Sequence, residues 1–471
     1  MDTELPRHAR PSWWMEEALA HDPGEPCPPH TGDETADVVI LGGGYTGMWT
    51  AHFLKERDPG VDVLLAERDV CGGGPSGRNG GFCNGLWEDL PALVSMLGEE
   101  RATRTCRVAE RSVPEIGTWC ERYGVDAWFQ MRGHMGVATS PAQDGAWRAT
   151  VELARRLGVA EGRFEELAAA QVADRCRSPL FGAGMLTPYA ATVQPARLVR
   201  GLRRVLLEQG VRVREGTTVL RFRGGSPVEV HTSAGRIRAG AAVLGLGAFA
   251  AGLRRFRRTI LPRGSYIILT APIPERLEEL GWTGGEGIYD FRTALHYLRT
   301  TRDGRLAFGA ASSRAGLGTG IGPRLDYDGV SVRRLVRDLG RMFPTLRDVP
   351  LEAAWGGPID VTGAHVPFFG TLPGGVHYGL GFTGGGVGPC HLAGRILSAL
   401  ALGMEDEYSR LPLVGMEPRP FPPEPLLSVG AFLTHEAIVR KDEAEDLGRR
   451  PNPVVDAMAR LPRRLGYELG P

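Results

Sequence analysis

The sequence lacks the features that mark membrane-spanning, nucleic-acid-binding and disulfide-linked proteins. Its 471 residues contain no run of about eighteen apolar residues, and they begin with charged and proline-rich sequence rather than a leader pattern. The 55 basic and 55 acidic residues cancel, which excludes a strong net field toward nucleic acid. The 7 cysteines are scattered and never spaced C-x-x-C, which excludes a disulfide framework and a zinc site. We therefore expect a soluble cytoplasmic protein without metal, membrane or nucleic-acid partners.

Lysine is also nearly absent, because only Lys55 and Lys441 occur and the other basic residues are arginines. This bias runs through every region of the chain, so a single arginine is a weak sign of a functional site. The length predicts two or three domains with a large buried core.

The clearest motif is a glycine turn between an apolar strand and a helix. Residues 38–41 are Val-Val-Ile-Leu, and Gly42, Gly44 and Gly47 follow at G-x-G-x-x-G spacing. The first glycine permits a tight turn, the second lets a pyrophosphate approach the backbone, and the third lets the helix lie close to the strand. Tyr45 and Thr46 fall at the helix start, where free N–H groups can hold phosphate oxygens.

A second predicted strand, residues 61–66, ends at Glu67, about twenty residues after the last glycine. A carboxylate at this spacing accepts hydrogen bonds from ribose hydroxyls and disfavours a 2′-phosphate. The motif therefore indicates a dinucleotide, and both NAD and FAD remain open at this point.

A glycine-rich loop at residues 71–81 comes next. It is either a flexible surface loop or a second part of the dinucleotide site, since Ser76, Arg78 and Asn79 offer hydrogen-bond donors. The order A-E-R, then S-G-R-N-G-G ending at Gly80 and Gly81, resembles the D-amino-acid-oxidase-like flavoproteins. Within that superfamily it is most similar to the branch of γ-glutamylputrescine oxidase and related amine oxidases.

The resemblance extends to three later blocks of the chain. Val219 corresponds to a residue whose backbone contacts adenine, Gly247 ends a strand similar to the family's A-T-G-A element, and residues 381–388 resemble its C-terminal glycine block. It implies bound FAD, and it implies these cofactor-binding residues: Gly42, Gly44, Tyr45, Thr46, Gly47, Glu67, Arg68, Ser76, Arg78, Asn79, Gly80, Gly81, Val219, Gly247, Gly381, Thr383, Gly384, Gly385, Gly386 and Val387.

The expected fold is α/β, with a Rossmann-like FAD-binding domain and a second, antiparallel-sheet substrate domain. The FAD-binding domain is predicted to be discontinuous (36–95, 190–262 and 352–403), and the substrate domain to comprise 96–189 and 263–351. Residues 1–35 are predicted to be an N-terminal arm docked through Trp13 and Trp14, with Ser12 capping a short helix. Residues 404–471 are predicted to be an extension with little chemistry.

Candidates for the substrate pocket lie on the second sheet. Tyr266, Arg292 and His296 are the tentative catalytic residues, and Tyr297 and Arg299 are further candidates. Period-two alternation over residues 289–300 would place Arg292 and His296 on one face and Tyr297 and Arg299 on the other, without deciding which face meets the flavin. His134, on a short predicted strand, is more readily explained as structural than as catalytic.

The resemblance implies oxidation of a primary or secondary amine or an amino acid by hydride transfer to flavin, giving an imine that water hydrolyses. The glycines of residues 316–320 follow no strand, so no second dinucleotide motif supplies an external reductant. Oxygen is the expected acceptor. The alternatives are a dehydrogenase or biosynthetic tailoring enzyme that passes electrons to a carrier, and a flavin-binding protein without turnover.

Two departures from the family pattern bear on the electron acceptor and on how the flavin is attached. Ala307 stands where sarcosine oxidases carry an oxygen-activating lysine, which leaves oxidase and dehydrogenase open. Residues 356–362 contain no cysteine and residues 76–81 no histidine, so we expect non-covalent FAD. The sequence leaves the oligomeric state open.

Overall fold

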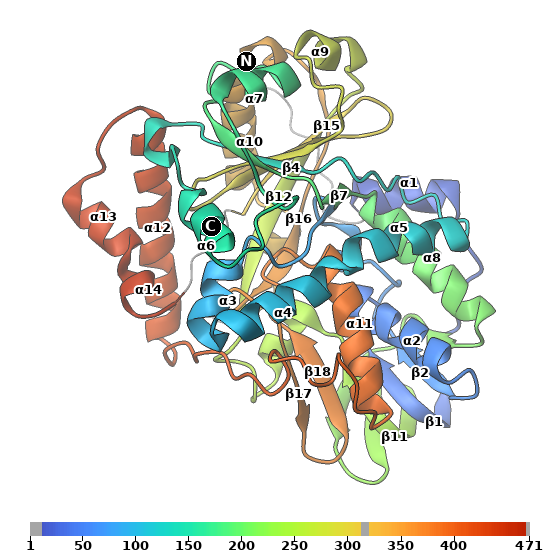
Figure 1. Ribbon diagram of the computed structural model, residues 1–471. Helices are drawn as coiled ribbons and strands as arrows, with labels where there is room; N and C mark the ends of the chain where they lie inside the picture. The colour runs from blue at the N-terminus through green and yellow to red at the C-terminus, as the bar shows by residue number, and fades with distance from the viewer. Residues whose placement is uncertain (1–11, 312–319, 468–471) are drawn as a thin grey trace.

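The computed structural model describes residues 12–311 and 320–467, so the glycines predicted at 316–319 lie outside the described residues. The described chain forms two eight-stranded sheets and one two-stranded ribbon. In Figure 1 the first sheet lies in the lower half of the molecule and the second in the upper half. The mixed α/β fold with two sheets agrees with the predicted fold class.

The first sheet has a parallel core around β1 (Gly32–Leu41), which pairs with β2 (Val63–Ala66) on one side and β11 (Gly235–Leu244) on the other. Val39 lies opposite both Leu64 and Ala242. Residues 38–41 are buried, as their continuous apolar run predicts. The remaining strands are β8 (Arg212–Arg214), β9 (Val219–Arg223), β10 (Val228–Thr232), β17 (Phe368–Leu372) and β18 (Val376–Leu380).

Two buried helices pack against this sheet and each other, α2 (Tyr45–Arg57) and α11 (Val387–Ala401), and a third, α8 (Pro195–Glu208), packs against α2. α2 and α11 lie side by side in Figure 1. Their close approach depends on Gly394, because a Cβ there would lie 2.6 Å from the backbone of Trp49. Two sequence segments more than three hundred residues apart thus form one helical layer.

The second sheet is mainly antiparallel, and the pairing of β13 with β4 is parallel. Its strands, in spatial order, are β16 (Leu351–Val361), β12 (Leu261–Thr270), β15 (Leu306–Ala310), β14 (His296–Thr300), β13 (Gly287–Asp290), β4 (His134–Val137), β6 (Gly184–Thr187) and β5 (Glu165–Leu167). Its outer core includes residues of α7 (Ala169–Arg175), α9 (Pro274–Glu279) and α10 (Gly329–Met342).

Two sequence predictions are corrected here. Residues 289–300 are not one strand, because β13 and β14 are separated by a turn at 291–295. β16 pairs with β12 in the second sheet, so its residues do not extend the first sheet as the predicted boundary at 352 implied. In addition, β1 begins at Gly32, four residues before the predicted start of the cofactor domain.

Residues 90–156 contain the helices α3 (Leu90–Leu97), α4 (Glu99–Glu110), α5 (Ser112–Arg122) and α6 (Arg148–Arg156). These helices cross the front of the molecule in Figure 1. β3 (Phe82–Cys83) directly follows the glycine-rich loop that ends at Gly81, and it pairs with β7 (Ala191–Thr192) in the two-stranded ribbon.

The N-terminal arm docks as predicted. The hydroxyl of Ser12 accepts a hydrogen bond from the Met15 amide and caps α1 (Trp13–His21). Trp14 is fully buried, with its ring edge-on to Trp355 of β16 at 5.9 Å. The Ser12 hydroxyl also donates to the carbonyl of Gly77 at 2.6 Å, which joins the arm to the glycine-rich loop.

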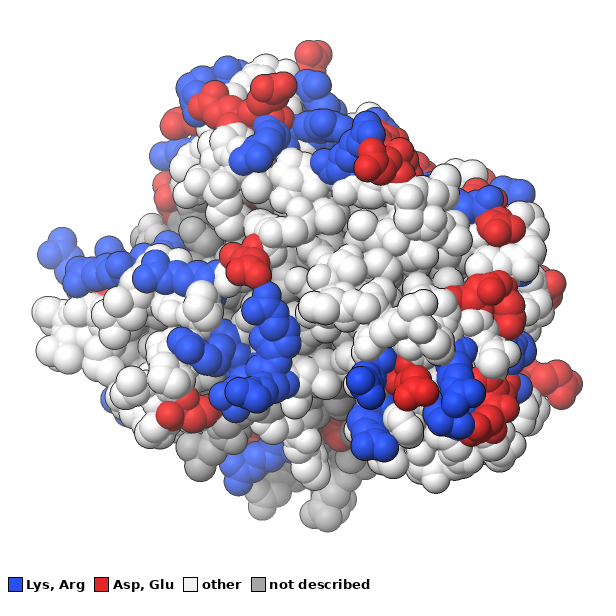
Figure 2. Space-filling model, turned by 90° about the horizontal axis from the view of Figure 1, so that it is seen from below, with Lys and Arg blue, Asp and Glu red and all other residues white. Residues whose placement is uncertain are grey.

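The C-terminal residues form α12 (Leu426–Asp446), α13 (Pro453–Ala459) and α14 (Leu461–Arg464), drawn in red in Figure 1. They lie against one side of the molecule, next to α3 and α6 in that view. Within the described part of the chain, no helix combines the length and apolarity needed to cross a bilayer. Figure 2 shows basic and acidic side chains interspersed around a broad uncharged area, in keeping with the balanced composition.

Candidate active site

The turn from β1 into α2 can be built only from glycine. Gly42 has φ +109°, and a Cβ there would lie 2.5 Å from the carbonyl oxygen of Gly245 at the end of β11. A Cβ on Gly47 would lie 2.0 Å from the carbonyl oxygen of Gly42. α2 begins at Tyr45, so its N-terminus opens at the carboxyl edge of the parallel strands. This edge is where open α/β sheets bind their ligands.

Glu67 follows β2 and lies beside that turn. Its carboxylate accepts the amide of Gly43 at 2.8 Å and that of Asp69 at 2.9 Å. Burial raises the pKa of Glu67, although both backbone amides favour its charged form. An ionised carboxylate offers about four acceptor positions, so two remain for ribose hydroxyls.

The other predicted nucleotide contacts lie around the same edge. The Thr217 amide donates to the Glu67 carbonyl at 2.7 Å, which brings the chain that leads into Val219 next to Glu67. Gly247 has φ +49° and borders open space, because no atom lies within 4 Å of where its Cβ would be. The Arg68 guanidinium lies over the ring of Phe249 at 4.7 Å, so this side chain stacks on protein.

The glycine-rich loop is fixed rather than flexible. The Ser76 hydroxyl accepts the amide of Tyr45 at 2.9 Å, and the Asn79 side chain accepts the amide of Gly81 at 2.7 Å. The Arg78 guanidinium is buried and donates to the carbonyl of Gly356 at 2.7 Å. Ser76 and Arg78 therefore hold the loop between the α2 N-terminus and the second sheet.

Tyr45 and Thr46 present their backbone, rather than their side chains, to the turn. The Tyr45 hydroxyl is buried and donates to the carbonyl of Pro195 at 2.7 Å. The Thr46 hydroxyl lies 3.2 Å from the sulfur of Cys390 on α11.

The C-terminal glycine block forms a second turn into a helix. Gly381, Thr383 and Gly384 have φ values of +83°, +49° and +91°, and Gly386 precedes the first residue of α11. The Asp360 carboxylate accepts the Gly381 amide at 2.7 Å and fixes this turn. Burial raises the pKa of Asp360 to about 6, against the hydrogen bonds from backbone amides.

A cavity of about 490 Å³ connects the two glycine-rich loops with the second sheet. Asn79 and Gly80 line it from one loop, and Thr383, Gly384 and Gly385 line it from the other. Arg263, Ser265 and Tyr297 line it from β12 and β14, and residues 421–467 line it from the C-terminal helices. Most of its exposed lining is apolar.

Glu88 and Asp89 place two carboxylates in this cavity, eight and nine residues after Gly80. The Thr187 hydroxyl donates to Glu88 at 3.2 Å, and Tyr289 also hydrogen-bonds to it. Burial, reinforced by the neighbouring Glu88, raises the pKa of Asp89 to about 7. Among residues 12–311 and 320–467, the Asp89 side chain makes no hydrogen bond or ion pair.

Comparison with known proteins identifies the family. Residues 37–400 match the model of the FAD dependent oxidoreductase (DAO) family. The chain belongs to this family. Members of the family are FAD-dependent, so this protein is an FAD-dependent oxidoreductase, as the sequence resemblance implied.

Individual relatives agree with this assignment. The chain is 31% identical to the probable oxidoreductase OrdL of Rhizobium meliloti (strain 1021), over 84% of this chain and 90% of that protein. It is 28% identical to the γ-glutamylputrescine oxidoreductase of Escherichia coli (strain K12), over 79% and 85%. The structure of glycine oxidase from Geobacillus kaustophilus shares the fold, with a TM-score of 0.66 and 20% identity over 82% of this chain and 99% of that chain.

The glycine-lined edge of the first sheet has the form that FAD requires. Its tight turn admits no Cβ, the helix N-terminus faces the carboxyl edge of the strands, and Glu67 keeps free acceptor positions. The second glycine turn, fixed by Asp360, lies at the cavity that also reaches Gly80.

The tentative catalytic residues Tyr266, Arg292 and His296 do not line this cavity, which corrects their sequence-based placement in the pocket. Tyr266 is buried in the outer core of the second sheet, where its hydroxyl donates to the carbonyl of Arg324 at 2.7 Å. The imidazole of His296 contacts Asp290 at 2.7 Å and Asp338 at 3.4 Å on the same outer side.

Arg292 belongs to the turn between β13 and β14, and its guanidinium lies 2.9 Å from the imidazole of His296, with which alternation had grouped it. Its guanidinium is buried within 3.7–3.8 Å of the carboxylates of Asp338, Asp442 and Asp446. Burial lowers the pKa of Arg292, but these carboxylates and Asp290 raise it overall. Arg292 therefore neutralises buried acids instead of facing a substrate.

The face of β14 that meets the cavity is the one that carries Tyr297, whose hydroxyl lies 2.7 Å from that of Ser265. Arg299 on the same face donates to the carbonyls of Val193 and Gly81, and burial lowers its pKa to about 9. His134 also lines the cavity, but its ring bonds to the Ala191 carbonyl at 2.9 Å. Burial lowers the pKa of His134 to about 4.

Sequence reasoning missed Glu88, Asp89, Arg263 and Asp360. The adjacent acids Glu88 and Asp89 directly precede the apolar residues that form α3, and this position was the one available signal in the sequence. No sequence signal marked Arg263 or Asp360, since arginine is frequent in this chain and an isolated aspartate is common in any protein.

Proposed function

We propose that this protein oxidises the C–N bond of an amine. The observation that carries the proposal is the position of Glu88 and Asp89 in the cavity that connects both glycine-rich loops. Two carboxylates without a cationic partner among the described residues are suited to a cationic ligand such as a protonated amine. The name of the relative from Escherichia coli, γ-glutamylputrescine oxidoreductase, is consistent with an amine substrate.

FAD would extend from the edge of the first sheet to the cavity. The pyrophosphate would lie on the backbone of Gly42, Gly44, Tyr45, Thr46 and Gly47, and the ribose on Glu67. Ser76, Arg78 and Asn79 would support the middle of the cofactor by positioning the loop that ends at Gly80 and Gly81. Arg68, Val219 and Gly247 would border the adenosine. The flavin ring would meet Gly381, Thr383, Gly384, Gly385, Gly386 and Val387.

When bound, FAD would supply the hydride acceptor for the carbon that carries the nitrogen, and water would hydrolyse the resulting imine. The side chains of the cavity would prepare the amine for this step. Asp89, with a pKa of about 7, would pair with the ammonium group and accept its proton. Glu88 would stay oriented by Thr187 and Tyr289.

An amino acid is a second candidate substrate because Arg263 also lines the cavity. No hydrogen bond or ion pair of its guanidinium occurs within the described parts of the chain, and burial lowers its pKa to about 10. At neutral pH it keeps its charge and could hold a substrate carboxylate.

Anaerobic mixing with amines and amino acids tests this function. Bleaching of the bound flavin by amines, reduced at least tenfold in rate in Asp89→Asn, is expected. A flavin that stays oxidised with every amine while reacting with another class of reductant would contradict the proposal. Faster bleaching by amino acids than by their decarboxylated amines, lost in Arg263→Met, would favour the second candidate.

Oxygen is proposed as the acceptor, with an electron carrier as the alternative. Ala307 lies in the buried core of β15 and offers no charge to oxygen. Stopped-flow mixing of the reduced protein with oxygen decides between them, because reoxidation slower than turnover would require a carrier.

FAD is proposed to be non-covalent, so acid precipitation should leave a colourless pellet and a yellow supernatant.

A further inference from the structure

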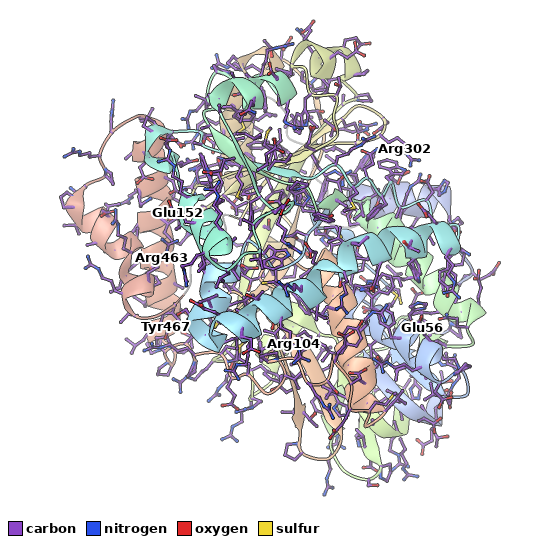
Figure 3. The ribbon with its side chains drawn as sticks, viewed as in Figure 1. Glu56, Arg104, Glu152, Arg302, Arg463 and Tyr467 are labelled. Atoms are coloured by element: carbon purple, nitrogen blue, oxygen red, sulfur yellow. The ribbon has the colours of Figure 1, made fainter. Side chains whose placement is uncertain are left out.

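Residues 404–471 were predicted to be an extension with little chemistry, but some of them line the cavity. We call residues 421–467 the C-terminal segment. Figure 3 labels Arg463 and Tyr467 at its end, and Tyr467 is one of the cavity residues. From α12, Leu427, Gly430, Ala431, Thr434 and Ile438 face the same space. The cavity is therefore lined by the second sheet, both glycine-rich loops and the C-terminal segment.

This segment lies beyond the part of the chain that defines the family, since the matched region ends at residue 400. The compared glycine oxidase is covered over 99% of its length, yet the alignment leaves 18% of this chain unmatched. The common fold thus supplies the flavin-binding loops, while the C-terminal segment adds a surface to the cavity.

The segment is held firmly against the second sheet. The Asp442 carboxylate accepts the Ala294 amide at 2.9 Å, and Asp446 pairs with Arg341 at 3.0 Å. Both acids also face the buried guanidinium of Arg292. Ala294 and Ile438 belong to one buried apolar cluster with residues of α13. The contacts fix α12 at the turn between β13 and β14, whose residues 293–295 also line the cavity.

The chemistry of the cavity differs between its two sides. Glu88 and Asp89 provide negative charge, whereas the C-terminal segment contributes chiefly apolar side chains such as Leu427, Ile438 and Leu465. A small hydrophilic amine would leave this apolar surface in contact with water, whereas an apolar group on the amine would cover it.

Building on the proposed function, we propose that the C-terminal segment is the specificity determinant of the cavity and selects amines that carry an extended apolar group. The ammonium group would lie at Glu88 and Asp89, and the apolar group along Leu427, Gly430 and Ile438 of α12.

Quaternary ammonium ions test this without turnover, because their nitrogen cannot lose a proton or reach the neutral form required for oxidation. The FAD-bound protein is titrated with tetramethylammonium and hexyltrimethylammonium, and the shift of the flavin absorption spectrum gives each Kd. A buried methylene contributes about fourfold in affinity, and the longer ion carries about five more of them, so burial of only about three makes it bind about fiftyfold more tightly.

Two variants alter the proposed surface in opposite ways. Gly430→Leu adds a side chain where no atom lies within 4 Å of the new Cβ, so the helix tolerates it while the cavity narrows. Leu427→Ala removes a buried side chain that lines the cavity. Each is expected to reduce the affinity ratio of the two ions at least about fivefold. Val429→Leu, at an exposed neighbouring position, should keep the wild-type ratio.

Equal affinity for both ions in the wild type, or a ratio that neither variant changes, would overturn the proposal. Failure of the proposed function is a separate result. In that case the wild type would prefer the longer ion and the variants would lose this preference, but no oxidisable amine would bleach the flavin.

Discussion

The nucleotide end of the site and the substrate cavity are built by different means. At the nucleotide end, backbone atoms of one continuous strand–turn–helix unit determine the shape, because a Cβ added to Gly42 or Gly47 would lie less than 3 Å from a backbone carbonyl oxygen. In the cavity, residues 75–89, five strands of the second sheet (β16, β12, β14, β13 and β4) and the C-terminal segment converge.

This difference indicates which half of the site tolerates substitution. A turn that admits no Cβ tolerates no substitution, whereas a surface of apolar side chains can change with little cost to the fold. The matched family region includes both glycine-rich loops and stops before α12.

The largest effect is expected from Gly47→Ala, which breaks the nucleotide end. The added Cβ would lie 2.0 Å from the Gly42 carbonyl oxygen, so the turn must move away from its binding geometry. We expect at least a hundredfold weaker retention of FAD, measured as the ratio of flavin to protein absorbance after gel filtration. Gly74→Ala is the matched control, because its φ is −79° and no atom lies within 4 Å of the position that its Cβ would take. Full FAD occupancy in Gly47→Ala would contradict the role of this turn.

A smaller effect is expected from Arg292→Met, which lowers the free energy of unfolding and loosens the C-terminal segment beside the cavity. Removing the buried guanidinium leaves the carboxylates of Asp338, Asp442 and Asp446 without this countercharge. Loss of one partner of a buried ionic cluster costs about 3–5 kcal/mol, measured by urea unfolding. We also expect faster proteolysis within the C-terminal segment, with FAD retained.

Arg276→Met is the control for that variant, since Arg276 forms an exposed ion pair with Glu279 and should cost less than about 1 kcal/mol. If Arg292→Met unfolds like the control, the charge cluster does not hold the C-terminal segment.

The smallest effect concerns the pH dependence of cation binding. Asp89 has a pKa of about 7 in the cavity, so its carboxylate is ionised above that pH and protonated below it. Affinity for tetramethylammonium, whose charge does not titrate, should therefore fall about tenfold from pH 8 to pH 6. Asp89→Asn should abolish this dependence. Glu88 is the nearest other titratable group, and a profile unchanged in Asp89→Asn but flattened in Glu88→Gln would assign the effect to Glu88 instead.

The sequence by itself determined the cofactor class and the two-sheet fold. The run at residues 38–41, the spacing of Gly42, Gly44 and Gly47, and the loop at 76–81 report local backbone geometry, which a linear pattern can encode. Capping by Ser12 and burial of Trp14 were predictable for the same reason.

Only the tertiary structure decided which residues face the cavity. The turn of five residues between β13 and β14 places Arg292 in a cluster of acids, and alternation along β14 turns His296 to that same cluster while Tyr297 faces the cavity. The approach of α12 to the cavity depends on contacts between residues nearly 150 positions apart, such as Ala294 with Asp442. Local propensity cannot encode such contacts, because they arise when apolar surfaces and charges of separate elements are buried together.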